Sequence, residues 1–410
     1  MPKPEELRRY ADIIIQVGAN VQRGQSVTVT APLETAPFVR LLTERLYAAG
    51  AGIVRQRWHD PQSERLTYEH ALESELGQVP LWEVQRQTEE IEANSALIYV
   101  DADDPDLLRG VDPGRVALAR KARGQAFKAA DDRIMADEVT WVVCASPSPA
   151  WARKMFPDLK GDEEAVEALW QTLLRVMRTE GDDGVGAWRA HFDDLERRAE
   201  FLNQSHFQRL HYRAPGTDLH LELPPLHLWS AARTQNARGA GFAANLPTEE
   251  VYTLPARGSA EGSVRATLPL VYHGVVIEDI ELRFEAGRIV DFSSRTGYET
   301  LRQLIETDEG SHYLGEVALV PVTSPIAQEG RLFYSTLFDE NASCHLAVGH
   351  AYPTCLQGGR EMSEEQLQQA GLNDSITHVD FMIGSDGLDI DGETQAGELV
   401  PVMRKGLWAF

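Results

Sequence analysis

The chain has 410 residues, which is more than one hydrophobic core usually organises, so two domains are expected. Acidic residues outnumber Lys and Arg by 63 to 39, and the resulting net charge of -24 repels phosphate backbones, so nucleic acid is excluded as an expected partner. Three irregularly spaced cysteines, and no stretch near the ~20 apolar residues of a membrane span, predict a cytoplasmic protein that does not bind membranes.

The first half of the chain alternates helical and strand periodicity. Helices are predicted at residues 5–17, 35–49 and 116–129, and strands at 25–30, 52–58, 96–101 and 140–145. Strands that alternate with helices are typical of a parallel sheet. Two charged helical stretches follow, at 163–178 and 186–203. We therefore expect an N-terminal α/β domain with a mostly parallel sheet, which together with this helical connector spans residues 1–205.

From about His206 the pattern changes to alternating strands interrupted by Gly and Pro. Gly274 and the pair Ala286–Gly287 mark predicted hairpin turns. These features favour an α+β domain with a largely antiparallel sheet over residues 206–410. The candidate metal ligands all fall within this C-terminal domain, which is therefore expected to be the catalytic, metal-binding one.

Two segments offer carboxylates. The string NLPTEEVYTLP, residues 245–255, presents Glu249 and Glu250, and adjacent residues of an extended chain point to opposite faces, so at most one enters a shared site. The alternative for this segment is a turn capped by Thr248 with both acids exposed. Glu316 begins an apolar run, where a carboxylate is either exposed at the end of a strand or bound to a partner.

Two further segments add imidazoles. DENASCH, residues 339–345, could supply Glu340 and His345 as oxygen and nitrogen ligands, or could be a hydrogen-bonded turn. In HVDFMIG, His378 and Asp380 stand two residues apart on an apolar strand, so both side chains project from one face and can reach one ion.

Together these segments hold more candidate ligands than one tetrahedral zinc requires: Glu250, Glu316, Glu340, His345, His378 and Asp380. This set suits two metal ions about 3.5–4 Å apart that share a carboxylate and a water or hydroxide. A dinuclear phosphoesterase or amidohydrolase would use the same chemistry, and a metal-stabilised binding protein is the non-enzymatic alternative. The absence of HExxH and GxSxG excludes the common zincins and serine hydrolases.

Four strings in this domain closely resemble the aminopeptidase T family, bacterial metallo-aminopeptidases that lack HExxH: NLPTEEVYTLP, LGEVALVPVTSPI, STLFDENASCHLAVGHAYP and LNDSITHVDFMIG. The resemblance implies an aminopeptidase of broad specificity that binds two divalent ions per chain, cobalt, zinc or magnesium, and forms a homodimer. It places the family's metal ligands on the six candidates, with Glu316 as the residue that bridges the two ions.

The mechanism expected from these residues is hydrolysis of peptides with a free N-terminus by a water molecule that the two ions share and activate. Glu316 is assigned a catalytic role because it bridges the ions. Tyr352 is a second catalytic candidate, since its phenol could hydrogen-bond the oxyanion of the tetrahedral intermediate. The alternative for Tyr352 is a packed tyrosine with a satisfied hydroxyl.

Overall fold

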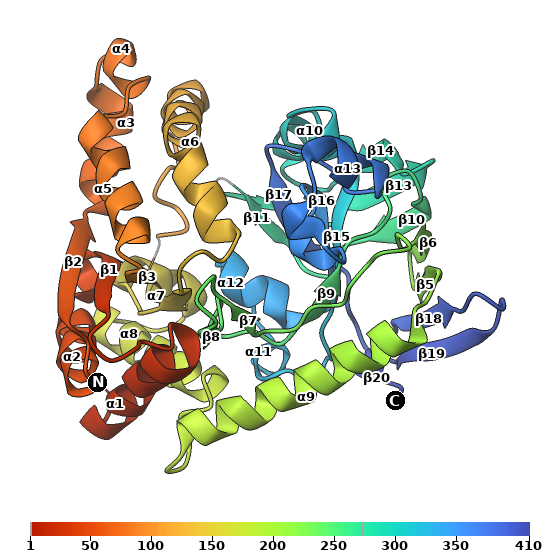
Figure 1. Cartoon of the computed structure of the whole chain (residues 1–410). Coiled ribbons are helices and arrows are strands. Elements are labelled where there is room, and N and C mark those ends of the chain that lie inside the picture. The colour runs from red at the N-terminus through yellow and green to blue at the C-terminus, as the bar shows by residue number, and fades with distance from the viewer. Residues whose placement is uncertain (1, 103, 273) are drawn as a thin grey trace. The chain divides into compact units, whose positions relative to one another are not determined.

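The computed structural model describes residues 2–102, 104–272 and 274–410 (Figure 1). It divides into two compact units, one formed by Met1–His191 with Arg233–Pro247 and the other by Phe192–Ala232 with Thr248–Phe410. The chain leaves the first unit inside helix α9 (Gly184–Ser205), returns for the 233–247 segment, and then completes the second unit. A domain border at residue 205 stays a prediction.

The first unit is built on a parallel sheet with the strand order β2-β1-β3-β4. Its strands are β1 (Ser26–Pro32), β2 (Ile53–His59), β3 (Ala96–Asp101) and β4 (Trp141–Ala145). Val29, Ile98 and Val142 are fully buried within it. The predicted parallel sheet is confirmed, and each predicted strand lies within two residues of an observed one.

Helices surround this sheet: α1 (Pro4–Ile13), α2 (Ala36–Ala48), α3 (Pro61–His70), α4 (Glu73–Leu76), α5 (Leu81–Glu92), α6 (Pro113–Met135), α7 (Pro149–Met155) and α8 (Asp162–Val176). Helix α1 packs against α2 and α8, and α3, α4 and α5 pack against α6 (Figure 1). The sequence patterns singled out no element between residues 59 and 95. There Leu66, Leu72 and Leu81 are exposed, and Leu76 and Ile91 are buried singly, so no continuous apolar stripe makes these helices recognisable. A short hairpin, β7 (Thr234–Gln235) with β8 (Gly241–Phe242), also belongs to this unit.

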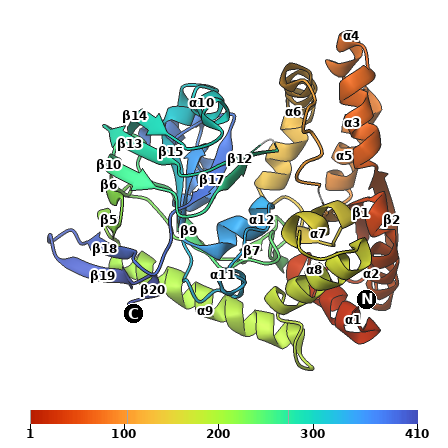
Figure 2. The same ribbon diagram turned by 180° about the vertical axis from the view of Figure 1, so that it is seen from behind.

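The second unit contains a long antiparallel sheet with the order β14-β13-β10-β6-β5-β18-β19-β20 (Figure 2). Its strands are β5 (Arg209–Ala214), β6 (Thr217–Glu222), β10 (Glu261–Arg265), β13 (Glu281–Glu285), β14 (Arg288–Ser293), β18 (Asp389–Glu393), β19 (Leu399–Arg404) and β20 (Leu407–Trp408). The predicted turn at Ala286–Gly287 joins β13 to β14. Both of its residues have positive φ, 48° and 78°, as a tight hairpin turn requires.

A smaller antiparallel sheet of the same unit, β17-β16-β15-β9, positions the candidate site. Its strands are β9 (Val251–Thr253), β15 (Leu314–Leu319), β16 (His345–Gly349) and β17 (His378–Met382). Beside it lies a hairpin of β11 (Leu270–Tyr272) and β12 (Val275–Ile277), with the predicted turn residue Gly274 between them. Short helices complete the unit: α10 (Tyr298–Ile305), α11 (Pro325–Gln328), α12 (Thr336–Asp339) and α13 (Glu364–Gln369). The antiparallel character expected of this part of the chain is confirmed.

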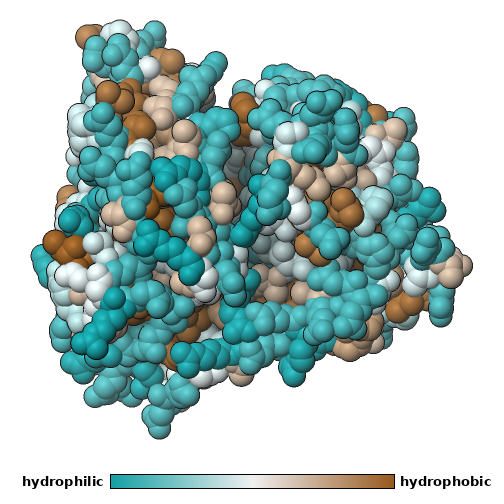
Figure 3. All heavy atoms as spheres, in the orientation of Figure 1, coloured by the Kyte–Doolittle hydropathy of each residue, from teal (hydrophilic) through white to brown (hydrophobic). Residues whose placement is uncertain are grey.

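The surface is polar. Figure 3 shows hydrophilic side chains over most of the visible face, with hydrophobic residues scattered among them. This agrees with the large excess of acidic residues. Across the described parts of the chain, none of the helices is long and apolar enough to cross a membrane.

Candidate metal centre

The smaller sheet carries predicted ligands on one face. Glu316 on β15 pairs with Ala347 on β16, which pairs with Asp380 on β17. His345 precedes Ala347 by two residues and His378 precedes Asp380 by two, so both imidazoles share this face because side chains alternate along a strand. Ala347 projects only a methyl group between the carboxylates on its two neighbouring strands.

The opposite face of these strands is apolar. Val317, Leu346 and Phe381 alternate with the polar residues, and each is at most 2% exposed. Burial of each such side chain stabilises the sheet by roughly 1.5–3 kcal/mol. The strands that carry the predicted ligands are therefore stabilised by apolar packing on their opposite face.

A β-bulge directs Glu316 towards this face. The register between β15 and β16 shifts between Leu314 and Glu316, with Gly315 as the extra residue. A Cβ atom on Gly315 would lie 2.2 Å from the carbonyl oxygen of His350 and 2.3 Å from that of Gly349. Only glycine therefore permits the close backbone approach that shapes the bulge.

Five of the six predicted ligands meet in what we call the carboxylate–imidazole cluster: Glu250, Glu316, His345, His378 and Asp380. The Nε2 atom of His345 lies 3.1 Å from Oε2 of Glu250 and 3.6 Å from Oε1 of Glu316. The Nε2 atom of His378 lies 3.5 Å from Oε2 of Glu316 and 3.5 Å from Oδ1 of Asp380. Each oxygen of Glu316 thus faces a different imidazole.

Both imidazoles are oriented by backbone carbonyls. Nδ1 of His345 lies 3.1 Å from the carbonyl oxygen of Ser343, and Nδ1 of His378 lies 2.7 Å from that of His350. A carbonyl can only accept a hydrogen bond, so Nδ1 carries the proton in each ring. Nε2 is then the atom that can bind a metal ion, and it points into the cluster in both rings.

The donor set of the cluster fits divalent metal ions. Three carboxylates and two imidazoles are the ligand types that zinc, cobalt and related ions accept. Oδ1 of Asp380 is buried, and its contact with Nε2 of His378 is long, at 3.5 Å. A buried carboxylate oxygen needs a compensating charge, which a cation held beside it would supply.

Burial shapes the protonation of the acidic groups. It raises the pKa of Glu316, and together with the nearby carboxylates of Asp380 and Glu250 it raises the pKa of Glu340 well above its usual value. Burial also acts to raise the pKa of Asp380, but the charge and hydrogen bond of His378 lower it overall.

Burial affects the two imidazoles in the opposite sense, because it acts to lower their pKa values. Burial opposes their charged form, yet Glu250 and Glu316 hold the pKa of His345 well above its usual value. Asp380 and Glu316 likewise raise the pKa of His378 to about 10. Without an ion the cluster therefore retains protons on its imidazoles. Cations of higher charge can displace those protons, and metal binding should release them.

Glu340, the sixth predicted ligand, lies outside the two groups of close donor atoms. It follows helix α12 and lines a small pocket together with Asp380. Its Oε1 accepts a hydrogen bond from Nδ2 of Asn341 at 3.3 Å. The structure thus places Glu340 next to the cluster, on a separate turn.

Tyr352, the predicted oxyanion donor, follows β16. Its ring centroid lies 4.8 Å from that of His378, and the two rings are tilted by 39°. Burial, together with the negative charges of Glu316 and Asp380, raises the pKa of Tyr352 well above its usual value, so the phenol keeps its proton. The structure therefore places a protonated phenol beside the cluster.

Sequence reasoning missed two residues of this neighbourhood. Tyr252 pairs with Ala318 and so shares the ligand-bearing face; its spacing of two from Glu250 could have predicted this. Asn341 is fully buried, and its Oδ1 accepts the backbone N–H of Glu249 at 2.7 Å. No sequence signal could identify that bond, because it joins segments 92 residues apart.

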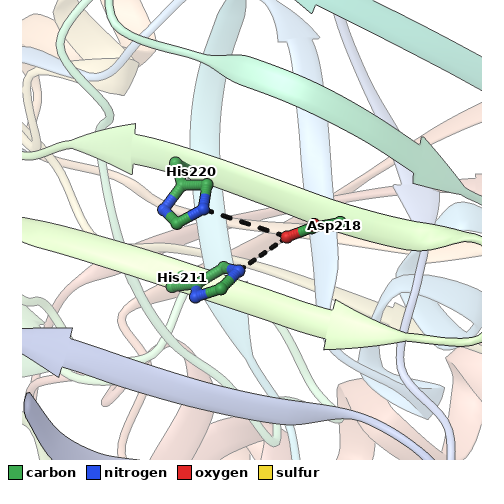
Figure 4. A group of neighbouring side chains, drawn as sticks. All are labelled: His211, Asp218 and His220. Carbon is green, nitrogen blue, oxygen red and sulfur yellow. Dashed lines mark hydrogen bonds and ion pairs between the residues drawn. The ribbon is translucent and has the colours of Figure 1, made fainter.

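A second group of potential ligands, His211, Asp218 and His220, lies on the β5–β6 hairpin (Figure 4). Nε2 of His211 is 2.6 Å from Oδ1 of Asp218, and Nη1 of Arg213 is 3.2 Å from Nδ1 of His211. An arginine can only donate hydrogen bonds, so Nδ1 of His211 accepts one from Arg213. Nε2 of His211 then carries the ring proton and donates a hydrogen bond to Asp218. This tautomer leaves neither nitrogen free to bind a metal ion. We therefore interpret the group as a surface hydrogen-bond network.

The chain is similar to known proteins over nearly its whole length. The family model described as thermophilic metalloprotease (M29) matches residues 3–408. Aminopeptidase AmpS of Bacillus subtilis is 46% identical over 406 residues, and aminopeptidase T of Thermus aquaticus is 40% identical over 406 residues; each match covers 99% of both chains. The solved structure of wild-type AmpT from Thermus thermophilus superposes with a TM-score of 0.93 at 40% identity and covers 99% of both chains. The resemblance inferred from the sequence motifs is confirmed, and the chain belongs to the M29 family of thermophilic metalloproteases.

Proposed function

We propose that this metallo-aminopeptidase releases N-terminal residues from peptides of broad sequence, with two divalent ions held by the cluster and by Glu340. The observation that carries the proposal is the position of Glu316, whose two carboxylate oxygens face two different imidazoles. One ion would be held by Glu250, Glu316 and His345, and the other by Glu316, His378 and Asp380. Glu316 would thus bridge them. Cobalt, zinc and magnesium are the candidate ions.

Ions bound there would supply an activated water nucleophile and a Lewis acid for the scissile carbonyl. The residues of the chain orient and stabilise the reacting groups. Both imidazoles are fixed in one tautomer by backbone carbonyls, so they present Nε2 without reorganisation. Tyr352 keeps its phenolic proton and would donate a hydrogen bond to the substrate oxygen as negative charge develops on it.

The acidity of the site favours removal of the terminal residue rather than cleavage within a peptide. A free N-terminus carries a positive charge at neutral pH, which the surrounding carboxylates attract. A blocked N-terminus lacks that charge and adds an acyl group. We therefore expect the acetylated form of a good substrate to be cleaved at least about 100-fold more slowly, a difference of roughly 2.7 kcal/mol.

Chelation tests the metal requirement. Treatment with EDTA should abolish hydrolysis of leucyl p-nitroanilide, and addition of cobalt or zinc should restore it, because the proposed nucleophile is a water molecule activated by the bound ions. The acetylated substrate serves as the matched probe for the exopeptidase assignment. Full activity after exhaustive removal of metal, or efficient cleavage of the acetylated substrate, would contradict the proposal.

We also propose that the protein is a cytoplasmic homodimer that acts on peptides and binds neither nucleic acid nor membranes. The resemblance to the family supports the dimer, and the net charge of -24 supports the exclusion of nucleic acid. Light scattering of the purified protein would test the dimer directly. A mass of one chain, 45.6 kDa, would contradict it.

A further inference from the structure

The segment that leads into β17 is a surface loop, and it comes directly before the proposed metal ligand His378. Ile376, two residues before that ligand, is 83% exposed, and Ser375 and Thr377 are only half-buried. Apolar packing therefore contributes little to fixing this segment, and its position is set by hydrogen bonds instead. Two of these bonds lead to one carboxylate, that of Asp308, which lies 68 residues before Ile376 in the chain.

We propose that Asp308 is a positioning residue for the metal centre: it fixes residues 375–377 and thereby holds the imidazole of His378 in the orientation that binds an ion. The inference rests on the proposed function, in which His378 is a ligand of one of two ions. Oδ2 of Asp308 accepts the backbone N–H of Ile376 at 2.7 Å, and Oδ1 accepts the hydroxyl of Ser375 at 2.8 Å. Hydrogen bonds to an ionised acceptor are roughly twice as strong as neutral ones, so this carboxylate is suited to holding an exposed loop.

Asp308 is itself held independently of the loop. Its backbone N–H donates to the hydroxyl of the fully buried Ser311 at 2.9 Å, and that hydroxyl lies 3.0 Å from the carbonyl oxygen of Ile305, the last residue of α10. The N–H of Ser311 in turn donates to Oδ1 of Asp308 at 2.8 Å. Burial acts to raise the pKa of Asp308, but the hydrogen bonds from Ile376, Ser375 and Ser311 lower it overall, so the carboxylate stays ionised. The end of α10 thus presents a fixed negative charge to the loop.

A chain of hydrogen bonds connects Asp308 to His378. The hydroxyl of Ser375 donates to Asp308, so its oxygen accepts the N–H of Thr377 at 3.2 Å. The carbonyl of Thr377 accepts the N–H of His350 at 2.6 Å, and the carbonyl of His350 accepts Nδ1–H of His378 at 2.7 Å. The ring of His378 is therefore aligned by the backbone of a residue that is bound to the loop. If residues 375–377 shift, Nε2 of His378 loses its fixed direction into the cluster.

These contacts concern one of the two proposed ions. His378 follows the loop directly, whereas the ring of His345 is oriented by the carbonyl of Ser343, on a different segment. Removal of the Asp308 carboxylate should therefore weaken binding of the ion proposed beside His378 and leave the ion proposed beside His345 nearly unchanged. A general loss of stability would instead affect both ions alike.

Cobalt titration of the metal-free full-length protein, followed by calorimetry and by the visible spectrum of bound cobalt, tests the proposal. The wild type should bind two ions per chain. Asp308→Ala should bind one ion with an affinity within about two-fold of wild type and the other about 10- to 100-fold more weakly. Its kcat for leucyl p-nitroanilide should accordingly fall at limiting cobalt and recover in excess cobalt. Asp279→Ala is the matched control, because it removes an exposed aspartate that also accepts hydrogen bonds, from Arg265 and Arg295, and it should change neither affinity.

Ser375→Ala provides a second test that keeps the carboxylate and its bonds to Ile376 and Ser311, and it decides the matter if Asp308→Ala does not fold. It removes the acceptor of the Thr377 N–H and should weaken the same one of the two ions. Unchanged cobalt affinities, or equal weakening of both ions, would overturn the positioning role and leave the aminopeptidase assignment intact. Fewer than two cobalt ions per chain in the wild type would contradict the proposed function, and this inference with it.

Discussion

Glu316 is the residue on which the candidate centre depends, because it is the one member shared by both groups of close donor atoms. It is 5% exposed and lies between two imidazoles. A carboxylate in such a place either pairs with protonated histidines or binds cations between them. The donor types, together with the buried Oδ1 of Asp380, whose nearest imidazole nitrogen is 3.5 Å away, favour cations.

Glu316→Gln tests this role. A glutamine has no negative charge and only one acceptor oxygen, so it cannot serve two ions. We expect loss of both metals and a decrease in kcat/KM of at least about 100-fold. Metal content by elemental analysis and activity should fall together. Glu281→Gln, at an exposed glutamate on β13, is the control and should change neither; two metals per chain with normal turnover in Glu316→Gln would refute the bridge.

Asn341 provides a second test at this scale. Its side chain links the segment that carries Glu250 to the turn that carries Glu340, through bonds to the Glu249 N–H and to Oε1 of Glu340. Asn341→Ala should release both segments and weaken metal affinity by about 10- to 100-fold.

The matched control for Asn341 is Asn373→Ala, which removes an equally buried amide whose Nδ2 donates only to the carbonyls of Gly310 and Gly349. Both variants should be less stable, because each leaves buried polar groups unpaired. Cobalt titration of the metal-free proteins distinguishes them. Equal cobalt affinities would show that Asn341 has only a structural role.

At the scale of elements, the sheet β17-β16-β15-β9 brings alternate residues of neighbouring strands together on one face, where they form the candidate metal centre. Alternation alone predicts that His378 and Asp380 share a face. It cannot predict that Glu316 lies opposite Ala347, because that register is set by pairing between strands about 30 residues apart and by the bulge at Gly315. The sequence therefore indicated which residues could be ligands, whereas their convergence depends on long-range pairing.

Gly315→Ala tests the contribution of the bulge. The added methyl group would lie 2.2 Å from a backbone carbonyl oxygen, so β15 or its neighbour must shift and Glu316 must move with it. We expect the free energy of unfolding to fall by about 1–3 kcal/mol and metal binding to weaken. Gly124→Ala, in the interior of helix α6 where no atom apart from the adjoining helix backbone lies within 4 Å of the new Cβ, should instead be neutral or stabilising by up to about 1 kcal/mol. Denaturant titration with and without cobalt measures both effects; unaltered cobalt binding in Gly315→Ala would contradict this account.

For the molecule as a whole, regular patterns predicted the fold class better than they predicted its details. The buried strand at Ala96–Asp101 matches its prediction because apolar residues surrounded by helices form a continuous run. Helices α3–α5 went unpredicted because several of their apolar residues, such as Leu66 and Leu81, are exposed and the buried ones, Leu76 and Ile91, form no continuous stripe. The two compact units could not be read from local patterns either, since the 233–247 segment joins the first unit through contacts distant in sequence, such as the bond from the Val143 N–H to the Ala244 carbonyl.

The stability of the molecule should fall in mild acid, and one buried imidazole outside the metal centre contributes to this. His227 is 3% exposed, its Nδ1 donates to the carbonyl of Pro224, and burial lowers its pKa from 6.5 to about 4. Below pH 6.5 the unfolded state gains a proton that the folded state cannot accept, so the stabilisation present above pH 6.5 is lost as the pH falls towards 4. A shift of this size corresponds to about 3 kcal/mol.

His227→Phe removes this titration and still leaves the Pro224 carbonyl bonded to the backbone N–H of residue 227. The free energies of unfolding of the two proteins should be compared at pH 8, where His227 is neutral in both states and their difference reports packing alone. At pH 4.5 that difference should shift in favour of the variant by about 2–3 kcal/mol. The measurement belongs in EDTA, because metal binding is itself pH-dependent. An identical difference at the two pH values would show that His227 does not resist protonation in the folded chain.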